Sequence, residues 1–143
     1  MNLRQVLTQM QATTELREHV TAWKVTEATA GSFVDFPSSV DPRLVDVLRQ
    51  RGIERLFTHQ REAIEAVHKG KNVVVVTPTA SGKTLCYNIP ILNSLLENPE
   101  SRAIYLFPTK ALSQDQLDEL HGLITALGVD IKTYTYDGDT PVN

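Results

Sequence analysis

The sequence predicts an α/β fold, in which helices flank a parallel sheet, and three observations indicate this class. Residues 73–77, 103–107 and 131–136 are short runs rich in β-branched, aromatic and other apolar residues, as strands buried between helix layers are. Helical patterns separate these runs, at 82–96 and at 109–128. Strand, helix, strand, helix, strand is the order that right-handed parallel crossovers produce.

Residues 1–40 precede this pattern. Their first thirty residues predict helix, because apolar residues recur at helical spacing at Leu3, Val6, Leu7 and Met10, and again at Leu16, Val20 and Trp23. Small and turn-forming residues follow, from 28 to 39. We therefore expect residues 1–40 to form an N-terminal helical extension, and residues 41–143 to form the α/β domain.

Two further helices are expected before the first strand. Asp41 is a good N-cap with Pro42 at the first helical position, and Gly52 ends that helix. Thr58 is the predicted N-cap of the next helix, which ends at Gly70.

Composition excludes several classes of protein. The chain has 143 residues, 41% of them apolar, and a formal net charge of −3, so disorder is excluded as its main state. No apolar run approaches the roughly 20 residues of a membrane span, and the N-terminus does not resemble a secretory signal. The single cysteine, Cys86, excludes an internal disulfide, and we expect a cytoplasmic protein. With 17 acidic and 14 basic residues, nucleic acid can be bound only at a local site.

Residues 77–84, Thr-Pro-Thr-Ala-Ser-Gly-Lys-Thr, form the strongest motif. They match the phosphate-binding pattern G-x-x-x-x-G-K-[ST] except that Thr77 replaces the first glycine. Backbone N–H groups of such a loop and of the following helix bind a polyphosphate. Gly82 allows close backbone approach, Lys83 supplies a cation to the β- and γ-phosphates, and the Thr84 hydroxyl coordinates Mg²⁺. A chance Gly-Lys-Thr turn is the alternative, and the strand before and helix after the loop disfavour it.

The same loop resembles motif I of superfamily 2 (DEAD/DEAH-box) helicases, in which the first glycine is normally absent. Ala80 stands where many members have glycine. Residues 52–64 look like the Q motif of these proteins, 107–116 like motif Ia, and 136–141 like a Gly-Asp turn that follows the next strand. Within the superfamily, the wording of these motifs is most similar to the mitomycin-repair-factor type of RecQ-related DNA helicases.

This resemblance implies the first part of a RecA-like domain that binds ATP and Mg²⁺. The intact protein would be an ATP-dependent helicase or translocase, acting on single-stranded or duplex nucleic acid, with DNA favoured over RNA. The implied nucleotide site consists of one residue of the Q motif and six of the loop: Gln60, Thr79, Ala80, Ser81, Gly82, Lys83 and Thr84. Among these, Lys83 and Thr84 would also act in catalysis.

Gln60 is the residue that can select adenine, because its amide donates to adenine N7 and accepts from N6. The alternative is an exposed glutamine at a helix start. Phe57 or Leu56 is a candidate to lie against the base. Arg43 occupies the position, seventeen residues before Gln60, where DEAD-box members place a stacking aromatic, so the stacking residue stays unassigned.

Four residues are expected to contact the nucleic-acid backbone. Thr109 and Lys110 follow the second predicted strand, where ligands meet parallel sheets, and Gly138 and Asp139 lie in the later turn. Thr109 can equally serve as an N-cap, and Lys110 as a solvated surface residue. Asp137 or Asp139 could alternatively be the Mg²⁺-binding acid of an ATPase, but the preceding segment is too polar and has no adjacent pair of carboxylates.

No Asp-Glu box follows a predicted strand after residue 84, because the Asp-Glu-x-His sequence at residues 118–121 lies inside the predicted helix at 109–128. The resemblance therefore implies a RecA-like domain that is incomplete before that box, and a second RecA-like domain would be required for the motor. We expect this chain alone to be inactive as an ATPase. The alternative function is a non-motor module that binds nucleotide or a partner without hydrolysis.

Overall fold

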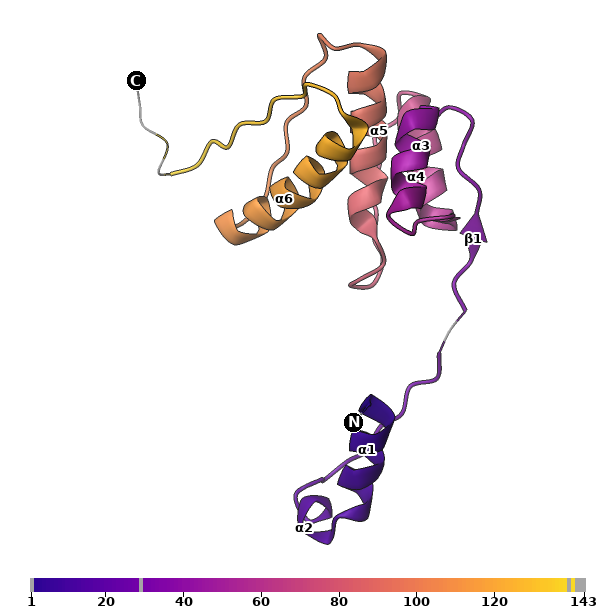
Figure 1. Cartoon of the computed structure of the whole chain (residues 1–143), viewed down its shortest axis with the longest axis vertical. Coiled ribbons are helices and arrows are strands. Elements are labelled where there is room, and N and C mark those ends of the chain that lie inside the picture. Colours follow the sequence, from indigo (N-terminus) through magenta and orange to yellow (C-terminus); the bar gives the residue numbers. More distant parts are fainter. Residues whose placement is uncertain (1, 29, 139, 141–143) are drawn as a thin grey trace. The chain divides into compact units, whose positions relative to one another are not determined.

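The computed structural model describes residues 2–28, 30–138 and 140, and it divides into two compact units, residues 1–30 and 31–143 (Figure 1). The first contains α1 (Leu3–Ala12) and α2 (Thr14–Arg17). The second contains two short strands and four helices: β1 (Phe33–Val34), α3 (Pro42–Gln50), β2 (Leu56–Phe57), α4 (Thr58–His68), α5 (Lys83–Glu97) and α6 (Lys110–Leu127). Within the described part of the chain, no helix combines the length and the apolar character that a membrane crossing requires.

The first unit is helical only in part. Asn2 and Gln5 cap α1 reciprocally, each side-chain oxygen accepting the other residue's backbone N–H at 2.9–3.0 Å. Helix ends at Arg17, so the predicted helix over the first thirty residues is wrong beyond that point. Val20 and Trp23 remain substantially exposed, and a short helix is marginal in water when no surface packs on its apolar side. Residues 31–40 belong to the second unit, because β1 pairs with β2.

Local capping explains where the helices of the second unit begin and end. The Asp41 carboxylate accepts the Arg43 N–H at 2.8 Å at the start of α3, and the Thr109 hydroxyl accepts the Leu112 N–H at 3.2 Å at the start of α6. Gly128 ends α6 in the left-handed conformation, with φ +65°. These predicted ends are confirmed.

The start of α4 differs from the prediction by one residue. Thr58 is the first helical residue, and Phe57 occupies the N-cap position. The side-chain oxygen of Gln60 accepts the Phe57 N–H at 2.8 Å, the bond by which the third helical residue of a capping box holds the N-cap residue. This bond makes Phe57 the N-cap and leaves Thr58 as the first helical residue.

The core of the second unit lies between its helices. α4 packs along α5, and α3 contacts both α5 and α6 (Figure 1). The largest fully buried apolar side chains come from α3, β2, α5 and α6: Leu44, Leu48, Leu56, Ile89, Leu92 and Leu123. β1 and β2 add a two-stranded antiparallel ribbon, with Phe33 opposite Phe57 and Val34 opposite Leu56.

The predicted parallel sheet is not formed by the described residues. Residues 73–77, 103–107 and 131–136 are non-helical but have no strand partner. Tyr105 and Ile131 pack against the helical core, whereas alternate residues of the three segments are exposed by 85–89%: Val74, Val76, Ile104, Leu106, Tyr134 and Tyr136. The physical reason is that a sequence can favour an extended segment, but a strand also needs a neighbour with which to exchange backbone hydrogen bonds.

Ile89→Ala should lower the free energy of unfolding by about 2–4 kcal/mol, because it removes a completely buried side chain from the centre of α5. Val67→Ala in α4 is the matched control: Val67 is 39% exposed, and its truncation should cost about 1 kcal/mol or less. Urea denaturation followed by circular dichroism measures both values. Equal losses would contradict this description of the core.

Candidate nucleotide-binding site

Gly82 lies between the loop of residues 77–81 and α5, and only glycine suits its surroundings. It is the N-cap of α5 and has φ +72°, in the left-handed region. A Cβ at this position would lie 2.5 Å from Nε2 of Gln60. The backbone of Gly82 and the side chain of Gln60 therefore approach each other as closely as the absence of a side chain permits.

The ammonium group of Lys83 lies among oxygen atoms of the loop. Its Nζ donates to the carbonyl oxygens of Thr77 at 2.8 Å and Pro78 at 2.7 Å. The hydroxyl oxygens of Thr77 and Ser81 lie 3.4 and 3.3 Å from it, and these two hydroxyls bond each other. The loop thus gathers one cation and several polar groups at the N-terminus of a helix, where the helix dipole favours an anion.

Ala80 carries backbone strain in this loop. Its φ is +60°, a conformation that costs an L-residue roughly 1–2 kcal/mol. Thr79 and Ala80 are both exposed on the loop. Ala80 stands where many superfamily 2 helicases have glycine, and its backbone conformation is one that favours glycine.

The N-terminal turn of α4 holds the loop from the other side. Gln60 donates from Nε2 to the Gly82 carbonyl at 2.8 Å, and a ring nitrogen of His59 lies 3.1 Å from the Ser81 carbonyl. Gln60 is only 2% exposed, so the alternative of an exposed helix-start glutamine is wrong. One N–H and one lone pair of the Gln60 amide are not used by these bonds. The role of His59 was missed, because no sequence spacing links it to Ser81.

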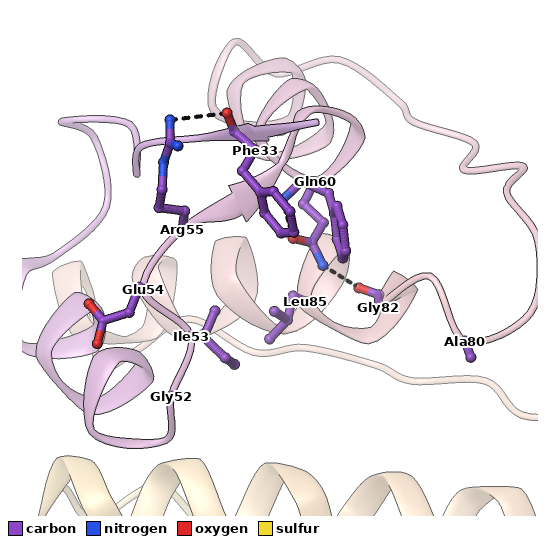
Figure 2. A pocket seen from close by; sticks show the side chains of 10 residues that line it. Phe33, Gly52, Ile53, Glu54, Arg55, Gln60, Ala80, Gly82 and Leu85 are labelled. Carbon is purple, nitrogen blue, oxygen red and sulfur yellow. Dashed lines mark hydrogen bonds between the residues drawn. The ribbon is translucent and has the colours of Figure 1, made fainter. Parts of the chain in front are cut away.

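A cavity of about 500 Å³ adjoins Gln60 and the loop (Figure 2). Phe57 lines it, whereas Leu56 is buried in the core, as alternation along β2 requires. Of the two candidates to lie against a base, only Phe57 therefore faces this cavity. The other lining residues come from β1, the α3–β2 turn, α4, the loop and α5: Phe33, Gly52, Ile53, Glu54, Arg55, Gln60, Ala80, Gly82 and Leu85.

The aromatic wall of this cavity is formed by two residues. Phe33 stacks on Phe57 with ring centroids 4.6 Å apart, and Arg55 donates to the Phe33 carbonyl at 3.1 Å (Figure 2). Sequence reasoning missed Phe33 and Arg55, because Phe33 lies 27 residues before Gln60, in the run of small and turn-forming residues from 28 to 39. Arg43, at the expected stacking position, instead pairs with Asp41 at 2.7 Å.

The first turns of α5 also set the environment of Thr84 and Cys86. The Thr84 hydroxyl donates to Oε1 of Gln116 on α6 at 3.2 Å.

Burial raises the pKa of the Cys86 thiol, so the thiol stays protonated near neutral pH and acts as an apolar packing group. Within the described ranges, no group of three His, Cys, Asp or Glu side chains is placed to hold a metal ion.

Two of the segments expected to contact nucleic acid lie together. Lys110 Nζ is 3.8 Å from a carboxylate oxygen of Asp137, which joins the start of α6 to the turn after residues 131–136. The Asp137 N–H donates to the Thr140 hydroxyl at 2.9 Å. Gly138 lies exposed in this turn, and Asp139 is outside the described residues. Thr109 caps α6, so its alternative structural role is confirmed.

The comparison with known families identifies the chain. The profile of the DEAD/DEAH box helicase family matches residues 57–143, which include the Q motif glutamine, the loop and α6. The chain belongs to the DEAD/DEAH box helicase family. The resemblance inferred from the four motifs is therefore confirmed.

Individual helicases are similar to the chain in sequence and in structure. The chain is 48% identical over 94% of its length to the uncharacterised ATP-dependent helicase YprA of Bacillus subtilis, and 46% identical over 64% to the ATP-dependent helicase hrq1 of Schizosaccharomyces pombe. It also matches the crystal structure of the DUF1998 helicase MrfA bound to DNA, over 99% of this chain at 45% identity, with a TM-score of 0.82. The chain thus has the fold of part of a helicase RecA-like domain.

The chain spans only a small part of these helicases. It covers 18% of YprA, 9% of hrq1 and 20% of the crystallised MrfA chain. The family and the geometry of the loop at residues 77–84 are therefore established for this chain. The activity of a whole helicase is not, because the chain covers so little of these relatives.

Gly82→Ala should lower the free energy of unfolding by about 2–4 kcal/mol, because it adds left-handed strain and displaces the buried Gln60 amide from its hydrogen bonds. Gly128→Ala is the matched control. Gly128 has a similar φ of +65°, but a Cβ there would meet nothing within 4 Å, so only the strain of about 1–2 kcal/mol should remain. Chemical denaturation measures the difference, and identical losses would disprove the close contact between Gly82 and Gln60.

Proposed function

We propose that the intact protein is an ATP-dependent DNA helicase or translocase, and that this chain binds the ATP. The observation that carries the proposal is the Lys83 ammonium, held among loop oxygens at the N-terminus of α5 and beside the cavity of Gln60. Phosphate oxygens can replace the loop carbonyls as its acceptors. The names of the similar proteins, among them ATP-dependent helicases, support the same function.

The described residues fit ATP with Mg²⁺. Loop residues 79–84 and the N-terminus of α5 would hold the phosphates, and Lys83 would neutralise charge that develops on the transferred group. The Thr84 hydroxyl would be a ligand of Mg²⁺, which prefers oxygen. When bound, ATP supplies a phosphoryl group whose transfer to water releases the free energy for movement along a strand.

Gln60 would bind the adenine edge within the cavity that it lines. The unused N–H and lone pair of its amide are the groups that such recognition requires. Phe33 and Phe57 would provide the aromatic surface for the base. This arrangement would favour adenine over guanine.

The nucleic-acid contact is proposed for Thr109, Lys110, Gly138 and Asp139. The ion pair between Lys110 and Asp137 supports this grouping, because it brings the two segments to one place. A hydroxyl, an ammonium and turn N–H groups suit phosphates and read no sequence. DNA is proposed over RNA because similar proteins are named DNA helicases, and one crystal structure of MrfA is of the protein bound to DNA.

We further propose that other parts of the intact protein complete the parallel sheet. Each of the three segments, residues 73–77, 103–107 and 131–136, has an exposed apolar side that a completed domain would cover. Asn88 gives independent support: its Nδ2 is buried and has no acceptor among the described residues. An unpaired buried N–H costs about 1–3 kcal/mol, and a backbone carbonyl of an added strand could satisfy it. A second RecA-like domain would complete the motor.

Lys83→Ala in the intact protein should reduce ATP hydrolysis by about 100-fold or more, because the charge-neutralising cation is lost. Binding to single-stranded DNA should change less than about twofold, since Lys83 lies in the nucleotide loop rather than at Thr109 or Lys110. Lys71→Ala is the matched control, because Lys71 is an exposed lysine before the first extended segment. Unwinding by the Lys83 variant at the wild-type rate would disprove the role of Lys83 in the ATP hydrolysis proposed to drive unwinding.

The 143-residue chain alone should show no ATP hydrolysis above background. Its Asp-Glu-x-His sequence at residues 118–121 lies within α6 and not at the end of a strand, where a Mg²⁺-binding acid would be expected. In related motors an arginine finger alone contributes roughly 10³ to 10⁵ in rate. A steady-state phosphate-release assay at saturating ATP and single-stranded DNA measures this. Turnover by the chain at the rate of the intact protein would contradict the need for further domains. If the intact protein bound ATP without hydrolysing it, the non-motor alternative would be favoured.

A further inference from the structure

Gln116 of α6 receives two hydroxyl hydrogen bonds from α5. Its Oε1 accepts from the Thr84 hydroxyl at 3.2 Å and from the Tyr87 hydroxyl at 2.5 Å. Thr84 and Tyr87 are three residues apart on α5, so they lie on the same face of that helix. All three side chains are half-buried. One amide oxygen on α6 thus organises two donors on the helix that follows the nucleotide loop.

The bond to Gln116 determines what the Thr84 oxygen can do. A hydroxyl has one hydrogen to donate and two lone pairs. In a helix, a threonine hydroxyl can turn back and donate to a carbonyl three or four residues earlier. Here its hydrogen is directed toward α6 instead. The two lone pairs of the Thr84 hydroxyl oxygen are consequently left to bind a cation.

We propose that Gln116 is a positioning residue for Mg²⁺, acting through the Thr84 hydroxyl. This rests on the proposed function, in which Thr84 is a ligand of Mg²⁺ bound with ATP. Groups that orient a metal ligand typically change metal affinity by about 10- to 100-fold when they are lost. Because the Thr84–Gln116 bond joins two neutral groups, we expect its loss to change Mg²⁺ affinity by no more than the lower limit of that range.

Tyr87 does not orient the Thr84 hydroxyl. Its hydroxyl is a second donor to the Gln116 oxygen and has no bond to Thr84. Tyr87→Phe therefore leaves the Thr84–Gln116 bond in place, while Gln116→Leu removes it. Gln116→Glu keeps an acceptor oxygen at the same reach. Together the three variants distinguish two effects of Gln116: accepting the hydrogen bond of the Thr84 hydroxyl, and packing between α5 and α6.

The experiment measures the Kd of a fluorescent ATP analogue for the intact protein, with saturating Mg²⁺ and with EDTA. For Gln116→Leu we expect the gain in affinity that Mg²⁺ gives to fall by about 5- to 10-fold, with the Kd in EDTA unchanged within about twofold. Gln116→Glu and Tyr87→Phe should keep the wild-type gain. In a Thr84→Ala background, Gln116→Leu should have no further effect.

Gln114→Leu is the matched control, because Gln114 lies on the same helix and, among the described residues, its side chain donates only to exposed Asp118, at 2.9 Å. Equal Mg²⁺ effects in wild type and Gln116→Leu would overturn the role of Gln116 while leaving the proposed function intact. A wild type that binds the analogue without any Mg²⁺ effect would overturn both. If thermal melting shows that Gln116→Leu is unfolded, Gln116→Ala against Gln114→Ala decides in the same way.

Discussion

The arrangement of the candidate nucleotide site depends on the hydrogen bonds of one buried side-chain amide, that of Gln60. It accepts the N–H of Phe57 and donates to the carbonyl of Gly82, and so joins the start of α4 to the start of α5 across 22 residues of sequence. Because Gln60 is almost fully buried, loss of either bond would leave a polar group unpaired in the interior, which is costly. Gly82 has no side chain for the same reason, since a Cβ would occupy the space of the amide.

This constraint places the other functional groups. With Gly82 held, the loop returns to α5 so that Lys83 contacts the carbonyls of Thr77 and Pro78. The following turn presents Thr84 to Gln116 of α6. The same helix α6 begins at Lys110, in the segment proposed to contact DNA. Helices α5 and α6 therefore carry groups proposed for phosphate, Mg²⁺ and nucleic acid, and the same two helices contribute buried side chains to one core.

The extended segments show how far local pattern and long-range pairing can differ. Each has the alternation of a strand, with Tyr105 and Ile131 against the helices and Ile104 and Tyr134 outward. Helices close their backbone hydrogen bonds within themselves, so α5 and α6 form wherever their caps and apolar faces allow. A strand cannot do this, and within the described residues only β1 and β2 have each other as partners. The sheet of the RecA-like fold thus depends on neighbours that pattern alone does not supply.

Sequence by itself determined the local features: the Asp41 and Thr109 caps, the glycine that ends α6, the Gly82-Lys83-Thr84 loop, and through four ordered motifs the helicase family. These features depend on residues a few positions apart, so the residue types and their spacing are enough to predict them. Only the tertiary structure decided that Gln60 is buried against Gly82, that Phe33 joins Phe57 at the cavity, and that Gln116 accepts the Thr84 hydroxyl. Each of those contacts joins residues more than twenty positions apart, and packing of whole helices and strands, rather than local preference, brings such residues together.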